Sequence, residues 1–272
     1  MIVFPNAKIN LGLNIVERRE DGYHNIETVF YPVGLSDILE VVPSDTCLDY
    51  SFSSSGIELG GDPEDNLIIK AYRLLRSDYQ FPAIDISLIK QIPFGAGLGG
   101  GSSDAAFMLK MLNEIFELKI TNRKLEKYAA LLGADCPVFI KNKPVFATGT
   151  GNVFTQVKLS LKNKFLLLVK PDIHVSTPVA YSHVTPEKPQ TSLFDLIKRP
   201  MIEWKETIKN DFEKSVFEAY PEIGAIKNQM YDLGAVYASM SGSGSSVFGI
   251  FESVIPQNDF FEGYFTTGGL LH

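Results

Sequence analysis

Hydrophobic and polar positions along the chain follow two different periods, one typical of strands and one typical of helices. Segments 1–16 and 25–42 carry β-branched and apolar residues in partial alternation, which predicts two strands. The polar connection between them contains an Asp-Gly pair, which is typical of a hairpin. Residues 84–92 alternate in the same way, and the apolar run at 162–171 predicts a buried strand.

Helical spacing begins before the middle of the chain. Residues 65–79 place their apolar side chains on one helical face, with Asp65 or Asn66 near the N-cap position. From residue 105 to residue 116 the apolar side chains recur at i, i+3, i+4 and i+7, which predicts an amphipathic helix. Residues 122–132 predict another short helix.

The second half of the chain is less regular. Residues 144–152, PVFATGTGN, predict a strand followed by a turn, and four prolines predict an irregular stretch over 171–190. A long helical region is expected from about residue 201 to 232, interrupted by Pro221. The segment SMSGSGSSVFGIF at 239–251 predicts a turn that leads into a strand.

Strands and helices thus alternate without strict βαβ regularity, so we expect an α+β fold. A length of 272 residues allows one large domain or two small ones. A weakly marked boundary is expected near residues 150–165.

Composition narrows the class of partner. A net charge of −7 argues against a nucleic-acid partner, although local basic groups and backbone amides can still bind an anionic small molecule. Two isolated cysteines, Cys47 and Cys136, favour a reducing compartment. Neither a secretory signal nor an apolar run of about 18 residues is present, so we expect a cytoplasmic protein without a membrane partner.

The most distinctive stretch is PFGAGLGGGSSD at residues 93–104, which lies between a predicted strand and a predicted helix. Free amides and the macrodipole at a helix N-terminus attract anions, and missing Cβ atoms let the backbone approach phosphate oxygens. We therefore expect a triphosphate-binding turn rather than a flexible surface loop. The expected nucleotide contacts are Pro93, Phe94, Gly95, Ala96, Gly97, Leu98, Gly99, Gly100, Gly101, Ser102 and Ser103.

Two other glycine-rich motifs that bind phosphate groups are similar to this loop. The P-loop pattern fails because no lysine follows the glycines. Gly95, Gly97 and Gly100 do satisfy GxGxxG, and Glu117 lies near the spacing of a ribose-binding acid. Glu117, however, ends a helical pattern, whereas that acid belongs at the end of a second parallel strand. A dinucleotide-binding oxidoreductase is therefore a remote alternative.

The loop PFGAGLGGGSSDAA closely resembles the PxxxGLGSS-type loop of the GHMP kinases. Five further segments resemble the same family in the expected order, from residue 5 to residue 248: PNAKINLGLNI, DGYHNIETVF, DNLI, LLGADCPVF and SGSGSSVF. The departures are Ala96 where glycine is common, Phe94 where methionine is common, and Asp104 where asparagine is common.

The resemblance implies a two-domain GHMP-kinase fold of α+β class with the active site in the cleft between the domains. An N-terminal ATP-binding and catalytic domain is expected over 1–155, and a C-terminal domain over 156–272. The implied cofactors are ATP and Mg²⁺, the latter carried mainly by ATP. The implied partner is a small molecule, a sugar-alcohol that carries cytidine diphosphate, and we expect a monomer or weak homodimer.

Two residues are candidates for the chemistry. Asp135 follows a helix-stopping glycine and precedes an apolar, strand-like run, where a charge needs a partner. Spacing alone leaves a turn or N-cap aspartate equally open, and the resemblance implies a base for the substrate hydroxyl. Lys8 lies in an otherwise apolar strand, where a lysine usually faces solvent at an edge. The resemblance implies instead that Lys8 stabilises the developing alkoxide and keeps Asp135 ionised.

The resemblance also implies substrate contacts from Asn10, Tyr23, His24 and Thr177. Stacking by Tyr23 and hydrogen bonds from His24 would suit a cytosine ring, which has a π-face and a polar edge. An ordinary loop histidine at 24 and a simple turn before Pro178 are the alternatives for His24 and Thr177.

Three further residues keep two interpretations each. Asn66 matches a nucleotide contact but would serve equally as a helix cap. Lys90 could meet phosphate or extend from its strand towards water. Asp104 favours the helix dipole but repels a nearby phosphate, so it either points away or helps to hold Mg²⁺.

Other functions remain as alternatives. A homoserine kinase or another small-alcohol kinase of the family is disfavoured by DGYHNIETVF, and a non-catalytic nucleotide-binding regulator by the presence of both Lys8 and Asp135. Thiol catalysis at Cys136 lacks a suitable histidine motif. The four histidines show no metal-ligand spacing, so no protein metal site is expected.

Overall fold

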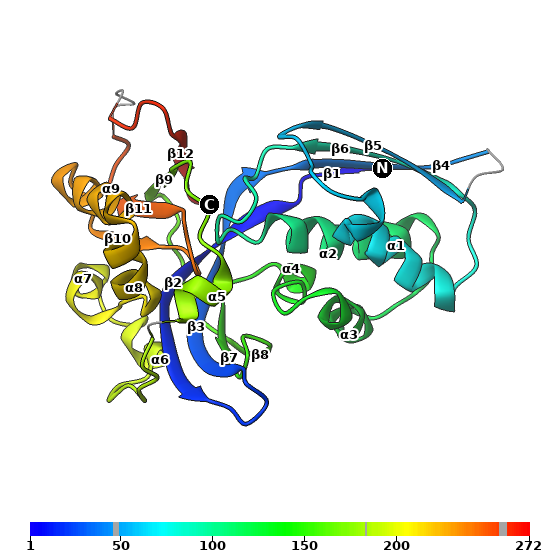
Figure 1. Cartoon of the computed structure of the whole chain (residues 1–272). Helices are drawn as coiled ribbons and strands as arrows, with labels where there is room; N and C mark the ends of the chain where they lie inside the picture. The colour runs from blue at the N-terminus through cyan, green and yellow to red at the C-terminus, as the bar shows by residue number, and fades with distance from the viewer. Residues whose placement is uncertain (46–48, 183, 256–259) are drawn as a thin grey trace. The chain divides into compact units, whose positions relative to one another are not determined.

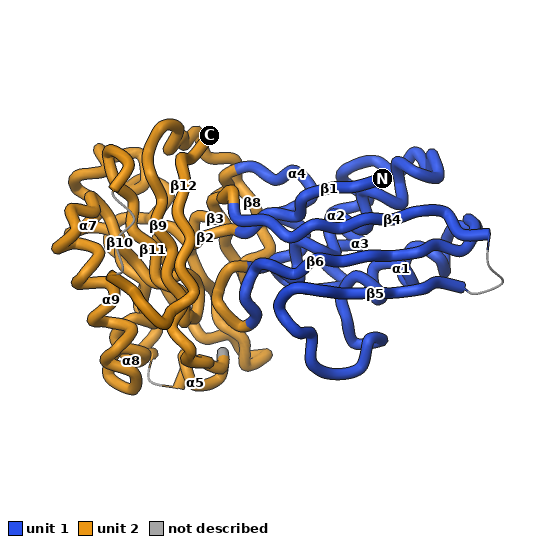
Figure 2. Tube along the Cα trace, turned by 90° about the horizontal axis from the view of Figure 1, so that it is seen from above, with its two compact units in different colours: residues 1–7, 35–94, 99–143 blue, residues 8–34, 95–98, 144–272 orange. Residues whose placement is uncertain are grey.

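The computed structural model describes residues 1–45, 49–182, 184–255 and 260–272, so Cys47 and His183 lie outside the described residues. The chain forms two compact units, each assembled from separate stretches of sequence (Figures 1 and 2). Unit 1 comprises residues 1–7, 35–94 and 99–143, and unit 2 comprises residues 8–34, 95–98 and 144–272. The sequence division after residue 155 stays a prediction.

Unit 1 is built on a four-stranded sheet in the order β1-β4-β6-β5. Its strands are β1 (Ile2–Val3), β4 (Ile38–Pro43), β5 (Tyr50–Gly56) and β6 (Ile84–Lys90). Neighbouring strands are antiparallel except β5, which runs parallel to β6. The alternation predicted for β6 turns Ile84, Ile86 and Leu88 into the core and brings Lys90 to the same inner face.

Helices cover one face of this sheet (Figure 1). They are η1 (Pro63–Asp65), α1 (Leu67–Asp78), α2 (Gly100–Ile115), α3 (Asn122–Leu132) and α4 (Val138–Lys141). The apolar face of α1 buries Ile68, Ile69 and Leu75, and that of α2 buries Leu109 and Leu112, as the helical spacing predicted.

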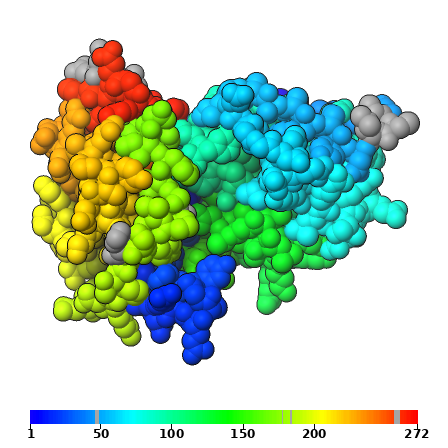
Figure 3. Space-filling view, in the orientation of Figure 1, coloured from blue at the N-terminus to red at the C-terminus, as the bar shows by residue number. Residues whose placement is uncertain are grey.

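Unit 2 contains two sheets, and the first is built on a long hairpin, most of which belongs to this unit. The strands β2 (Asn6–Arg18), β3 (His24–Ser36), β7 (Val145–Thr148) and β8 (Val153–Gln156) pair in the order β2-β3-β7-β8. The predicted Asp-Gly connection joins β2 to β3, with the N–H of Arg19 donating to the carbonyl of Tyr23 at 2.8 Å. This connection lies at the surface, in blue at the bottom of Figure 3.

The other sheet of unit 2 has the order β10-β11-β9-β12, all antiparallel. Its strands are β9 (Phe165–Lys170), β10 (Tyr237–Met240), β11 (Val247–Phe251) and β12 (Phe265–Leu270). The associated helices are α5 (Thr177–Tyr181), α6 (Leu193–Leu196), η2 (Met201–Glu203), α7 (Trp204–Thr207), α8 (Phe212–Ala219) and α9 (Pro221–Asp232). A continuous apolar core includes Leu167 and Val169 from β9, Val216 from α8 and Ile226 from α9.

Four local predictions were wrong or incomplete. The run after Asp135 is a single helical turn, α4, rather than a strand. The stretch 171–190 contains helix α5, because Ser176 accepts a hydrogen bond from the amide of Val179 and Pro178 suits the first turn. The region 201–232 is interrupted before Pro221, as predicted, because α8 ends at Ala219 and Pro221 opens α9, but it is also divided at 208–211, which was not predicted. Helix α2 begins at Gly100, inside the glycine loop, rather than at residue 105.

Among the described residues, no helix is both long enough and apolar enough to cross a bilayer.

Candidate active site

The glycine loop joins β6 to α2 through a series of left-handed turns. Gly95, Gly97 and Gly99 have φ values of +56°, +72° and +70°, which residues with a Cβ rarely adopt. Gly99 occupies the N-cap of α2 and supplies no side-chain hydrogen bond to it. The first amides of α2 therefore lack both helix acceptors and a side-chain cap, which is the arrangement that binds phosphate groups.

Within unit 2, the Ser-Gly turn after β10 packs against residues 95–98 of the loop. A Cβ on Gly97 would lie 1.9 Å from the carbonyl oxygen of Ser241, so only glycine fits there. The Ser241 hydroxyl donates to the carbonyl of Gly97 at 2.8 Å, and the amide of Ser246 donates to the carbonyl of Ala96 at 3.3 Å. This turn therefore supports residues 95–98 of the loop.

Lys8 is buried in β2, with 3% of its surface exposed, so the solvent-facing alternative is wrong. Its ammonium donates to Asn10 Oδ1 at 2.7 Å and to the carbonyl of Gly97 at 3.0 Å. The Asn10 amide in turn donates to Thr28 Oγ1 at 2.9 Å. The structure thus brings two predicted site residues, Lys8 and Asn10, against the glycine loop, and its hydrogen bonds fix the position of the ammonium.

Asp135 belongs to unit 1 and lies in the turn between α3 and α4. It is half-buried, and its backbone carbonyl accepts from the amide of Val138 at 3.2 Å. The N-cap position of α4 is taken by Pro137, so Asp135 is a turn residue and not the cap. Burial raises the pKa of the neighbouring Cys136 thiol to about 11, which leaves it protonated and unsuited to nucleophilic chemistry.

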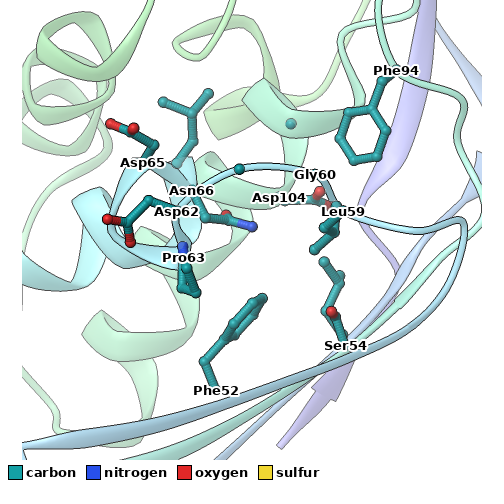
Figure 4. Close-up of a pocket in the computed structure, with 14 residues that line it drawn as sticks. Phe52, Ser54, Leu59, Gly60, Asp62, Pro63, Asp65, Asn66, Phe94 and Asp104 are labelled. Atoms are coloured by element: carbon teal, nitrogen blue, oxygen red, sulfur yellow. The ribbon is translucent and has the colours of Figure 1, made fainter.

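Beside the start of α2, unit 1 contains a cavity of about 480 Å³. Its walls come from β5, from the loop before η1, from the start of α1 and from the glycine loop. Phe52 and Phe94 turn their rings towards it, and the side-chain nitrogen of Asn66 is directed into it (Figure 4). The aromatic rings and the amide suit a flat heterocycle that has polar edges.

Asn66 is the helix cap that one interpretation predicted, and its contact with a nucleotide stays a prediction. Its side-chain oxygen accepts from the amide of Ile68 at 2.9 Å and thereby caps α1. It also lines the cavity, next to Leu67. Because the oxygen is used by the cap, the amide nitrogen is the group that it offers to a ligand.

Lys90 and Asp104 lie together in the interior of unit 1. The Lys90 ammonium donates to Asp104 Oδ2 at 2.7 Å and to Asp37 Oδ2, and all three residues are buried. Lys90 is therefore buried, and the interpretation that it extends towards water is wrong. The Asp104 carboxylate is directed to the Lys90 ammonium, and the residue also lines the cavity.

Two of the predicted substrate contacts of unit 2, His24 and Thr177, are associated with α5. The His24 ring stacks on the Tyr181 ring at a centroid distance of 4.7 Å and an angle of 21°. Burial and the charge of Arg18 lower the pKa of His24, which favours the neutral ring. Tyr23 is 67% exposed, a position open to a ligand. Thr177 begins α5, and its side chain lies outside the described residues.

Tyr181 was missed in the sequence because the prolines concealed the helix that carries it. The Tyr181 ring also packs edge-on against the Phe212 ring, with a centroid distance of 4.7 Å, and this contact fixes its position. The motif STPVAY, with a capping serine before proline, is the signal that would have revealed this helix.

Within the described ranges, no group of three or more His, Cys, Asp or Glu side chains is arranged to hold a metal ion. The roles of the predicted site residues stay predictions, but their positions are defined. Unit 2 holds Lys8, Asn10, Tyr23, His24, Gly95, Ala96, Gly97, Leu98 and Thr177, and unit 1 holds Asn66, Pro93, Phe94, Gly99, Gly100, Gly101, Ser102, Ser103 and Asp135.

Comparisons with known proteins identify the family. The model of the GHMP kinases N terminal domain matches residues 66–143, and that of the GHMP kinases C terminal matches residues 194–257. A Bacteroides fragilis protein named 4-diphosphocytidyl-2-C-methyl-D-erythritol kinase is 59% identical over 263 residues, which cover 96% of each chain. The chain belongs to the GHMP kinase family. The resemblance found in the loop and in the α+β pattern is thereby confirmed.

Solved structures agree with this assignment. A crystal structure of 4-(cytidine 5'-diphospho)-2C-methyl-D-erythritol kinase superimposes with a TM-score of 0.80 at 34% identity, covering 93% of this GHMP kinase and 91% of that chain. A homoserine kinase from Cytophaga hutchinsonii superimposes with a TM-score of 0.65 at 18% identity, covering 98% and 94%. The second likeness is one of fold alone.

Proposed function

We propose that this GHMP kinase transfers the γ-phosphoryl group of ATP to the 2-hydroxyl of 4-diphosphocytidyl-2-C-methyl-D-erythritol, a step of the non-mevalonate isoprenoid pathway. The observation that carries the proposal is the 59% identity with the Bacteroides fragilis kinase over 96% of both chains. The geometry of the loop, the buried lysine and the stacked His24 ring supports the same reaction.

ATP fits the residues present. The uncapped start of α2 and the left-handed glycines suit the triphosphate, and the aromatic cavity of unit 1 suits the base. Asn66 offers its amide nitrogen to that base, and Phe94 offers its ring face. Magnesium carried by the phosphates neutralises part of their charge and needs few protein ligands.

In the chemical step, the 2-hydroxyl oxygen bonds to the γ-phosphorus while the bond from that phosphorus to the β,γ-bridging oxygen breaks and ADP leaves. The hydroxyl proton passes to the carboxylate of Asp135. The ammonium of Lys8, held by Asn10 and by the Gly97 carbonyl, stabilises the negative charge that develops on the attacking oxygen. No covalent enzyme intermediate is needed, because positioning and electrostatics carry the reaction.

The cytidyl end of the substrate is assigned to the hairpin connection and α5. The neutral His24 ring can donate to or accept from the polar edge of cytosine, and its stacking on Tyr181 fixes the plane of that ring. The exposed Tyr23 side chain can close over the base. A cytoplasmic location and a monomer or weak homodimer belong to the same proposal.

Replacing Asp135 by asparagine tests the chemistry. We expect turnover to fall by about two to four orders of magnitude, the range typical of a lost general base, while MgATP binding is retained. Turnover is followed by ³¹P NMR, which shows the new phosphate monoester on the substrate, and binding by calorimetry. Near-normal turnover of the variant would remove Asp135 from the mechanism, and absence of the monoester with the native protein would reject the proposed reaction.

A further inference from the structure

The interior of unit 1 holds a cluster of three ionisable side chains, Lys90, Asp37 and Asp104, hereafter the Lys90 cluster. Lys90 comes from the end of β6, Asp37 from the junction of β3 and β4, and Asp104 from the second turn of α2. Their exposed fractions are 1%, 0% and 3%. One ammonium thus faces two carboxylates, and all three side chains are almost completely buried.

The two carboxylates are not equivalent. Asp37 Oδ1 accepts from the amides of Gln91 and Ile92, at 2.6 and 2.8 Å, and its Oδ2 accepts from Lys90. Asp104 Oδ2 accepts from Lys90 at 2.7 Å, but its buried Oδ1 has no hydrogen-bond partner in the described structure. Asp104, whose Oδ1 is buried without a hydrogen-bond partner, is therefore the carboxylate that accommodates a proton at the lower cost.

Few charged groups lie near Asp104 among the described residues. Lys90 and Asp37 are its ionic neighbours, and the Phe94 ring lies 5.2 Å from the Lys90 ammonium. Helices α1, α3 and α4 pack against α2, and their charged side chains lie at exposed or half-exposed positions. The other acidic residues that line the cavity, Asp62 and Asp65, are exposed on η1 and its cap. With both carboxylates ionised the cluster carries one net negative charge.

The cluster lies directly beneath the start of α2. A Cβ on Gly100, the first residue of that helix, would lie 3.0 Å from the Lys90 ammonium. Asp104 and Gly101 both line the cavity assigned to the nucleotide base. The charge of Asp104 therefore acts at short range, and through a medium of low dielectric constant, on whatever anion the start of α2 binds.

We propose that binding of MgATP at the glycine loop is coupled to uptake of a proton by Asp104, so that Asp104 is a positioning residue that sets nucleotide affinity through the charge of the Lys90 cluster. The inference rests on the proposed ATP site and goes beyond it. A triphosphate adds negative charge next to an already negative cluster, and protonation of Asp104 removes the repulsion. By linkage, whatever favours the proton favours the nucleotide equally.

The protonation equilibrium of Asp104 is consistent with this coupling near neutral pH. Burial raises the pKa of Asp104 to about 7, and the charge of Lys90 opposes the rise without cancelling it. If bound MgATP raises that pKa by about one further unit, the affinity for MgATP falls about tenfold as pH rises through the two values. Asparagine, the neutral analogue of a protonated aspartate, removes the coupling.

Calorimetry measures the coupling in the native protein, so no variant needs to fold. MgATP is titrated without alcohol substrate at pH 7.5 in buffers with different ionisation enthalpies, and the dependence of heat on buffer counts the protons taken up. Saturating magnesium keeps the triphosphate ionised. We expect net uptake of about half a proton per nucleotide with the native protein.

The variant arm compares Asp104→Asn with Asp85→Asn, which removes a carboxylate from the same strand as Lys90 but outside the cavity. We expect the Asp104 variant to show no proton uptake and a Kd for MgATP that does not depend on pH between pH 6 and 8.5. The Asp85 variant should behave as the native protein. Purely structural damage would lower kcat and stability without flattening the pH dependence.

Two results separate the possible failures. If MgATP binds without proton uptake and with a Kd independent of pH, the coupling is wrong while the proposed reaction stands. If MgATP does not bind the native protein at all, the proposed function fails first, and the inference fails with it.

Discussion

The position of Lys90 on the inner face of β6 could be predicted from the sequence, whereas its ionic partners could not. The alternation of IDISLIK places position 90 in phase with Ile84, Ile86 and Leu88, so the pattern itself puts the lysine on the inner face. Its two carboxylate partners come from positions 53 and 14 residues away and cannot be recognised without the fold. Asp104 was singled out by its type, but its partner was not foreseen.

Asp104 should make stability depend on pH. The pKa of Asp104 rises from 3.8 in the unfolded chain to about 7 in the folded protein. The contribution of Asp104 to the free energy of unfolding is therefore fully present below the unfolded pKa and is lost as pH rises through the folded pKa. Between pH 5 and pH 8 the native protein should lose about 2 to 3 kcal/mol relative to Asp104→Asn. Urea unfolding at each pH measures this difference. Parallel curves for the two proteins would show that Asp104 is ionised throughout the range.

Gly97 carries the contact between the glycine loop and the Ser241 turn. Replacement by alanine would place a Cβ 1.9 Å from a carbonyl oxygen at a φ of +72°. We expect a loss of about 1 to 3 kcal/mol or more in the free energy of unfolding, together with a large loss of turnover. Gly34→Ala is the matched control, because a Cβ there meets nothing within 4 Å and its φ is not positive. Equal stability of the two variants would contradict the close approach.

At the scale of elements, helices with one apolar face were the most predictable. Helix α3 begins and ends where the spacing and Gly133 indicate, and α1 starts at Leu67 after its N-cap Asn66, one of the two predicted caps. Helix α4 was misread as a strand because its three apolar residues are all buried, and a short buried run has no diagnostic period. The break at 208–211 depends on the side chain of Asn210, which donates to the carbonyls of Met240 and Gly242 far along the chain.

The start of α1 allows the two roles of Asn66 to be separated. Asn66→Asp keeps the oxygen that caps the helix but loses the amide donor in the cavity, whereas Asn66→Ala loses both. We expect the alanine variant to lose about 1 kcal/mol of stability and the aspartate variant to lose little. Both should raise KM for ATP. Thermal unfolding and steady-state kinetics measure the two effects, and an unchanged KM in both variants would leave Asn66 as a cap only.

At the scale of the whole molecule, the order of motifs from residue 5 to residue 248 was sufficient to identify the family, as the two matching family models and the 59% identical relative confirm. The composition of the two compact units could not be foreseen. Unit 1 takes residues 1–7 and 35–94 from either side of the long hairpin, because pairing of β1 with β4 joins positions far apart in sequence. Linear patterns do not encode such pairings.

The central claim is that the alcohol phosphorylated by this GHMP kinase is the cytidyl substrate. Coupled assays of ADP release, run at matched concentrations of 4-diphosphocytidyl-2-C-methyl-D-erythritol, homoserine and mevalonate, test it most directly. We predict turnover with the cytidyl substrate and a kcat/KM at least about a thousandfold lower with the other two, because they lack the cytosine ring that we propose His24, stacked on Tyr181, to recognise. ADP release with homoserine or mevalonate alone would contradict the claim.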